Sequence, residues 1–277
     1  MKNIHKKLML VSLVFMAAVF FMTPVSAEAK AGKQKLKINT TYTKYDFTGD
    51  KKEDKFLISA KDNGWAITEY SVFINGKEVF SKTSEYGLGY DIDVYRLELK
   101  NGKVFVAIIP IIDNGDIPDA AIYMYKNEKL TEVAPLDKLY SMGNHVSVSK
   151  MSVSGNKVKV KYSVMSNSLG SISFTLDYKY KSGKLVRATT KSKLTSGLNI
   201  KKWTANKKIK VYKSPNSKKK VMTLKKGQKV KIDKIYVNKK YSVTYLHVKT
   251  SKGKSGWIKG LKSYPKKTLF KEVVYAG

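Results

Sequence analysis

The sequence predicts an all-β protein: an amino-terminal antiparallel β-meander, forming a sandwich or part of a propeller, followed by a small carboxyl-terminal β-barrel. Short runs of alternating apolar and polar residues follow one another along most of the chain, which is typical of half-buried strands. Glycine and Asn-Gly turns separate these runs, as they do in hairpins. Within residues 35–195 only residues 136–142 suggest a helix, and a short one.

The first 27 residues have the pattern of a secretory signal peptide. Three lysines precede an uncharged run over residues 8–22, Pro24 follows, and small residues lead up to Ala27. Fifteen helical residues span about 22 Å, less than the roughly 30 Å of a membrane's hydrocarbon core. We therefore expect cleavage after Ala27 and a secreted mature chain without a transmembrane segment.

Residues 35–195 form the predicted amino-terminal β domain. Asn75-Gly76 and Asn101-Gly102 each separate two strand-like runs, which is a strong hairpin signal. The predicted strands are Leu36 to Tyr45, 56–58, 67–74, 78–80, 95–99, 104–112, 121–125, 146–153, 158–164, 171–180 and 185–188. Hairpin after hairpin favours an antiparallel meander, a sandwich or part of a propeller.

An acidic turn inside this domain resembles the calcium loops of secreted repeat families, including integrin-type propeller repeats. Four side chains and one carbonyl fall at the ligand positions of such a loop, and calcium takes six to eight oxygen ligands. The candidate ligands are Asp46, Thr48, Asp50, the Lys52 carbonyl and Asp54. Lys51 stands where these loops carry glycine. The alternative is a polar turn in which the aspartates accept hydrogen bonds from backbone amides. A weaker example spans residues 113–119.

The last eighty residues combine short strands with a dense field of lysine. The predicted strands are Ile209–Tyr212, Val221–Leu224, Lys229–Ile232, Tyr245–Val248 and Trp257–Lys259. Their spacing, with glycine turns and no helical period, predicts a small barrel.

In this region the chain resembles the bacterial SH3-like (SH3b) domain. The ordered features are the Ser214-Pro215 turn, Lys226-Gly227, and Gly253 followed by Gly256-Trp257-Ile258. The resemblance covers residues 202–263, with a linker at 196–201 and a carboxyl-terminal tail at 264–277. The family commonly has Asn-Val-Arg before the first turn, whereas Lys210-Val211-Tyr212 stands here. The resemblance implies a module that tethers a secreted protein, here from a Gram-positive bacterium, to the cell wall through peptidoglycan.

The net charge of +33 is concentrated at the carboxyl end. Residues 198–277 hold twenty-four lysines against two acids, a net of +22, whereas residues 28–197 carry only +8. Arg96 and Arg187 are the only arginines, and lysine is a point charge that lacks the guanidinium fork used to read base edges. We therefore expect contact with peptidoglycan or another anionic wall polymer and no sequence-specific nucleic-acid binding. The alternative is a highly charged surface that is merely solvated.

Aromatic side chains within this lysine field are the candidate ligand-binding residues. A ring face provides a platform for a sugar or a small peptide, and neighbouring ammonium groups complement carboxylates or phosphates. Each of these side chains has the alternative role of filling the barrel core. The candidates are Tyr212, Tyr236, Tyr241, Tyr245 and Trp257.

Catalytic motifs are sparse. The chain has no cysteine, which excludes a cysteine nucleophile, and His145 and His247 lie in different predicted domains without partners at metal-ligand spacing. We therefore expect a non-enzymatic wall-binding protein that displays its amino-terminal domain. The alternative is a wall or glycan hydrolase in which a pair of carboxylates in that domain performs catalysis. Its candidate carboxylates are Glu69, Glu85, Asp91, Asp93 and Glu98.

Overall fold

The computed structural model describes residues 31–275, and within this range the protein consists of antiparallel β-sheets with two short 3-10 helices. The predicted all-β class is confirmed. No helix in this range is long and apolar enough to cross a membrane. The predicted signal peptide, residues 1–27, lies outside the described residues.

The first sheet is a four-stranded meander in the order β2-β3-β4-β5. Its strands are β2 (Thr41–Tyr45), β3 (Asp54–Asp62), β4 (Ile67–Ile74) and β5 (Lys77–Thr83). The Asn75-Gly76 turn joins β4 to β5 with positive φ at both residues, 53° and 81°, as the sequence predicts.

The second sheet has five strands in the order β1-β6-β7-β8-β9. Its strands are β1 (Gly32–Leu36), β6 (Asp91–Glu98), β7 (Val104–Ile111), β8 (Ala121–Lys126) and β9 (Lys129–Pro135), with the 3-10 helix η1 (Asp113–Gly115) between β7 and β8. The predicted continuous strand from Leu36 to Tyr45 is wrong. Asn39 takes a φ of 54° and donates its backbone N–H to the Ile58 carbonyl, so β1 and β2 enter different sheets.

The third sheet has eleven strands and contains the rest of the chain. Its strands are β10 (Gly143–Ser154), β11 (Lys157–Ser166), β12 (Gly170–Lys181), β13 (Lys184–Arg187), β14 (Lys191–Ser196), β15 (Trp203–Thr204), β16 (Ile209–Tyr212), β17 (Lys220–Leu224), β18 (Lys229–Val237), β19 (Thr244–Thr250) and β20 (Ser255–Lys259). The 3-10 helix η2 (Lys138–Met142), inside the predicted helical stretch 136–142, precedes β10.

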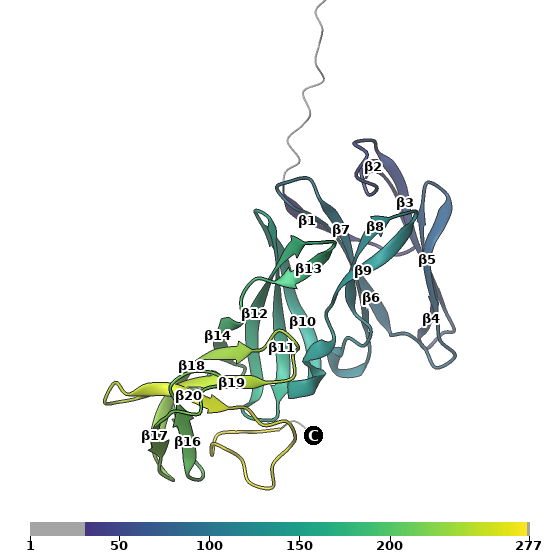
Figure 1. The fold of residues 1–277 in the computed structure, drawn as a ribbon. Helices are drawn as coiled ribbons and strands as arrows, with labels where there is room; N and C mark the ends of the chain where they lie inside the picture. The colour runs from purple at the N-terminus through teal and green to yellow at the C-terminus, as the bar shows by residue number, and fades with distance from the viewer. Residues whose placement is uncertain (1–30, 276–277) are drawn as a thin grey trace, which may run out of the picture.

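The second sheet separates two hydrophobic cores. β7 is buried along nearly its whole length because its side chains enter both cores alternately. Val106 and Ile108 pack with the first sheet, whereas Phe105 and Ala107 pack with the third. In Figure 1 the three sheets therefore follow one another, with β2–β5 at one end and β16–β20 at the other.

Strand β14 connects the middle of the molecule to its carboxyl-terminal part. Residues 194–196 pair with β12, and residues 191–193 pair with β18 (Figure 1). One core also contains residues from both sides of the predicted linker at 196–201, including Phe174 and Val230. The predicted domain division stays a prediction, but the hydrogen bonding and the core both run across it.

The strands of the carboxyl-terminal part are paired in the order β18-β19-β20-β16-β17, with β15 also on β18. Among the described residues no strand ladder joins β17 back to β15 or β18, so the backbone pairing is open. The last residues pack on this part: Leu269 and Phe270 are buried, and Phe270 forms a β-bridge with Ala205.

Candidate functional site

An aromatic cluster lies on the sheet formed by β18, β19, β20 and β16. Alternation along these strands directs their aliphatic side chains into the core. A bulge between Ile232 and Lys234 allows both Ile232 and Ile235 to remain buried. The opposite face carries five ring-bearing residues, which we call the aromatic face: Tyr212, Tyr236, Tyr245, His247 and Trp257.

Trp257 is at the centre of the aromatic face. It is the cross-strand partner of both Tyr212 on β16 and His247 on β19, and its ring centroid is 4.9 Å from that of His247. Tyr236 and Tyr245 form a neighbouring cross-strand pair with centroids 6.0 Å apart and rings nearly perpendicular. The structure thus brings four of the five predicted ligand-binding residues together.

The side chains of the aromatic face differ in how exposed they are to solvent. Trp257 and Tyr245 are each only 7% exposed, whereas Tyr212 and Tyr236 are half-buried. The turn after β16 reaches this face, because Asn216 Nδ2 lies 3.4 Å from the Tyr236 hydroxyl. Tyr212 and Tyr236 are therefore the more accessible rings of the aromatic face, whereas Trp257 and Tyr245 are almost covered.

Gly256 determines how closely β16 approaches the aromatic face. A Cβ atom at this position would lie 2.6 Å from both the Tyr212 carbonyl oxygen and Val211 Cγ1. Contacts this short are not tolerated, so any other residue would push β16 away from β20. The Gly-Trp pair in the sequence is thus needed to place Tyr212 beside Trp257.

Charged groups border the aromatic face. His247 Nδ1 lies 2.6 Å from Asp233 Oδ1, and Lys249 Nζ lies 3.2 Å from Asp233 Oδ2. Burial opposes ionisation of Asp233, but the hydrogen bonds and charges of His247 and Lys249 outweigh it and lower its pKa. Lys191 Nζ, from β14, lies 5.6 Å from the Trp257 ring centroid. No sequence motif marks Lys191, because only the pairing of β14 with β18 brings it here.

Tyr241 lies apart from the aromatic face. It packs against the main core, and its hydroxyl is 3.2 Å from that of Tyr178, which is 3.0 Å from that of Tyr162. Burial raises the pKa of the Tyr241 hydroxyl. The role that the structure indicates for Tyr241 is to attach the β18–β19 turn to the sheet formed by β10–β12.

The predicted calcium loop forms a hydrogen-bonded turn. Asp54 Oδ2 accepts the backbone N–H groups of Phe47 and Thr48 at 2.6 and 2.8 Å, and Asp54 Oδ1 accepts Asn75 Nδ2 at 2.8 Å. Asp46 accepts the N–H of Lys51, which has a φ of 70°, and Asp50 accepts that of Lys52.

These carboxylates therefore point at backbone amides. Among the described residues no three His, Asp or Glu side chains converge as metal ligands, here or in the loop at 113–119. In this arrangement Asp46, Thr48, Asp50, the Lys52 carbonyl and Asp54 fit a polar turn better than a calcium cage. Calcium binding stays a prediction.

The candidate catalytic carboxylates are mostly engaged in local contacts. Arg96 pairs with Glu98 at 2.7 Å, Lys35 pairs with Asp93, and Asp91 Oδ1 accepts the Ile92 N–H. Glu69 is paired with Lys61 at 3.0 Å, but it also lines one shallow hollow of about 350 Å³ together with Glu85.

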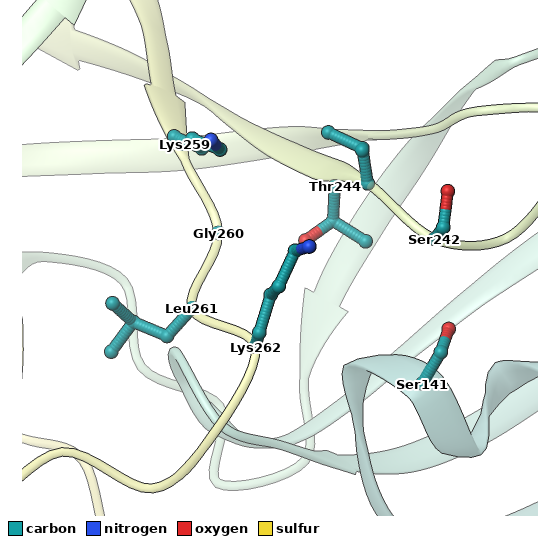
Figure 2. Close-up of a pocket in the computed structure, with 8 residues that line it drawn as sticks. Ser141, Ser242, Thr244, Lys259, Gly260, Leu261 and Lys262 are labelled. Atoms are coloured by element: carbon teal, nitrogen blue, oxygen red, sulfur yellow. The ribbon is translucent and has the colours of Figure 1, made fainter.

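A small pocket lies between η2 and the strands β19 and β20 (Figure 2). Its volume of about 10 Å³ leaves room for about one water molecule. Ser141, on η2, donates a hydrogen bond to the Tyr241 carbonyl beside it. We interpret this pocket as a packing seam between η2 and the carboxyl-terminal part rather than as a ligand site.

Comparison of the chain with protein-family models, with curated proteins and with solved structures gives no significant match. The SH3b resemblance therefore rests on the motifs quoted above.

Proposed function

We propose that this chain is a secreted, non-enzymatic protein of the bacterial envelope. In this proposal residues 202–263 form an SH3-like module that binds peptidoglycan or an associated anionic polymer, and the amino-terminal sheets are the displayed part. The observation that carries the proposal is the aromatic face centred on Trp257.

The chemistry of this face suits a wall polymer. The half-buried rings of Tyr212 and Tyr236 can contact the apolar face of a sugar or a short peptide. Lys191, the cross-strand partner of Tyr236, has its ammonium group over Trp257 and can complement a carboxylate or phosphate group. A ligand that has both an apolar face and an anionic group fits this site better than a purely apolar or purely anionic one.

The support for an SH3-like arrangement comes from the positions and pairing of the strands, not from a closed barrel. The five strands β16–β20 include all five runs that the sequence predicts, and β18–β20 form consecutive antiparallel neighbours. The turns that carry the motif, at Pro215, Gly227 and Gly253, all fall between strands.

Incubation of the purified mature chain with labelled peptidoglycan sacculi tests the proposal. We expect the chain to sediment with the sacculi and to release no soluble label. Release of fragments would instead establish hydrolysis, and absence of sedimentation would refute wall binding.

The hydrolase alternative has one observation in its favour, the hollow shared by Glu69 and Glu85. Glu69 is also paired with Lys61 at 3.0 Å, at a half-buried position of β4. If label is released, Glu69→Gln and Glu85→Gln should each abolish the release, because glycosidases need both carboxylates.

A further inference from the structure

A groove lined by lysines lies where the β12–β13 hairpin meets the β18–β19 turn. It has a volume of about 570 Å³, and its lining includes four lysines and no carboxylate. A second hollow of about 430 Å³ adjoins it, because Lys179 lines both. We call the two together the lysine groove; its lysines are Lys157, Lys159, Lys179, Lys181, Lys191 and Lys239.

Strand alternation explains why these lysines face outward. On β12 the side chains of Leu176 and Tyr178 enter the core, which leaves Lys179 and Lys181 exposed. Lys157 on β11 is the cross-strand partner of Lys179. Asp177 is the cross-strand partner of Lys159 and is partly buried, but it lines neither hollow.

A buried arginine adds to the positive charge of the groove. Arg187 is 7% exposed, and none of the ion pairs among the described residues involves it. A buried charge without a counter-charge is unfavourable. Its Nη1 and Nη2 donate to the carbonyls of Asn238 and Thr189 at 2.9 and 3.0 Å, so it ties together the two segments that form the groove walls.

We propose that the lysine groove binds a flexible linear polymer of phosphodiesters, such as a polyol phosphate. Separate ammonium groups along a groove suit a chain of repeated phosphates, because lysine contacts phosphate as a point charge. Nucleic acid is disfavoured: Tyr180 is the only ring in the lining, and it packs against Phe105 instead of offering a face for base stacking.

The groove also meets the aromatic face. Lys191 lines the groove and its ammonium group stands over Trp257. A polymer in the groove would therefore reach the proposed peptidoglycan site. This inference goes beyond the proposed function, since most of the groove lies outside residues 202–263.

Binding of synthetic poly(glycerol phosphate) to the full mature chain tests the inference. The triple variant Lys179→Gln, Lys181→Gln and Lys239→Gln should weaken binding about ten-fold, as expected for three exposed ion pairs. It should also reduce the slope of log affinity against log salt concentration by about two. The matched control, Lys225→Gln, Lys226→Gln and Lys229→Gln, removes the same charge near the β17–β18 turn and should change affinity less than about two-fold.

Three results would overturn the inference. The first is equal loss of affinity in both triple variants, which would indicate a diffuse effect of net charge. The second is tighter binding of polyglutamate of equal charge, which would indicate a carboxylate site. The third is tighter binding of oligo-dT.

The two proposals can fail separately. Sacculi stripped of phosphate polymers test the proposed peptidoglycan site, whereas poly(glycerol phosphate) tests the lysine groove. Unchanged thermal melting of both triple variants would show that folding is preserved.

Discussion

The ammonium group of Lys191 lies 5.6 Å from the centroid of the Trp257 ring. The two residues are 66 positions apart in the sequence, and β14 brings them together because its first half pairs with β18. This contact joins the lysine groove to the aromatic face. Deletion of residues 202–263 would remove β18, one of the two strands with which β14 pairs, so point variants of the whole chain are the sounder test of function.

Gly256→Ala should destabilise the protein by about 1–3 kcal/mol, because the added methyl group collides with the backbone of β16. Denaturant unfolding of the wild type and the variant measures this difference in the free energy of unfolding. Gly253→Ala provides a contrast, since a Cβ atom there meets nothing within 4 Å and only its φ of 78° is unfavourable. A loss of unfolding free energy below about 0.5 kcal/mol in Gly256→Ala would show that β16 does not require glycine at position 256.

Arg187→Met should lower the free energy of unfolding by about 1–3 kcal/mol, because the carbonyls of Asn238 and Thr189 lose their buried donor. Tyr178→Phe, which removes one hydroxyl from the same region, should lower the free energy of unfolding by about 1 kcal/mol. Hydrogen exchange at residues 238–243 should increase in Arg187→Met. Unchanged exchange there would contradict the role of Arg187 in holding the turn.

Asp233 should make stability depend on pH in the acidic range. Its pKa in the folded protein lies below the usual 3.8, so the ionised form stabilises the fold above that value. The contribution is lost as the pH falls through the lower, folded pKa. Asp233→Asn should therefore be less stable than wild type at neutral pH, and the difference should shrink on acidification. A difference that is constant across this range would refute the assignment.

Asp54 should matter for the turn at residues 46–54 whether or not calcium is present. Asp54→Ala removes three hydrogen bonds from a buried carboxylate and should cost about 2–4 kcal/mol. We expect the wild-type melting temperature to be the same with calcium and with EDTA. A clear rise with calcium would favour the ion-binding loop that the sequence suggests.

Local patterns were sufficient to predict most strands. The run Ile67–Ile74 coincides with β4, and Asn75-Gly76 forms the predicted hairpin turn. The break at Asn39 was missed because asparagine tolerates positive φ but does not require it. The alternating residues around Asn39 therefore concealed two strands.

The candidate site could be predicted only in part. Gly256-Trp257 and the strand tyrosines were visible in the sequence, but alternation alone could not show that Tyr241 faces the core from a turn. The lysine groove was hidden for a different reason. Its lysines come from β11, β12, β14 and the β18–β19 turn, and they lie together only because of the pairing across the third sheet.

Sedimentation of the full mature chain with purified sacculi is the most direct test of wall binding through the aromatic face. The double variant Tyr212→Ser and Tyr236→Ser removes its two accessible rings. The matched control, Tyr86→Ser and Tyr90→Ser, removes two exposed tyrosines, 96% and 61% exposed, from the loop before β6. We predict that the first variant stays in the supernatant while the control sediments like wild type. Sedimentation of the first variant together with loss of the control would place the wall contact in the amino-terminal part and contradict the account.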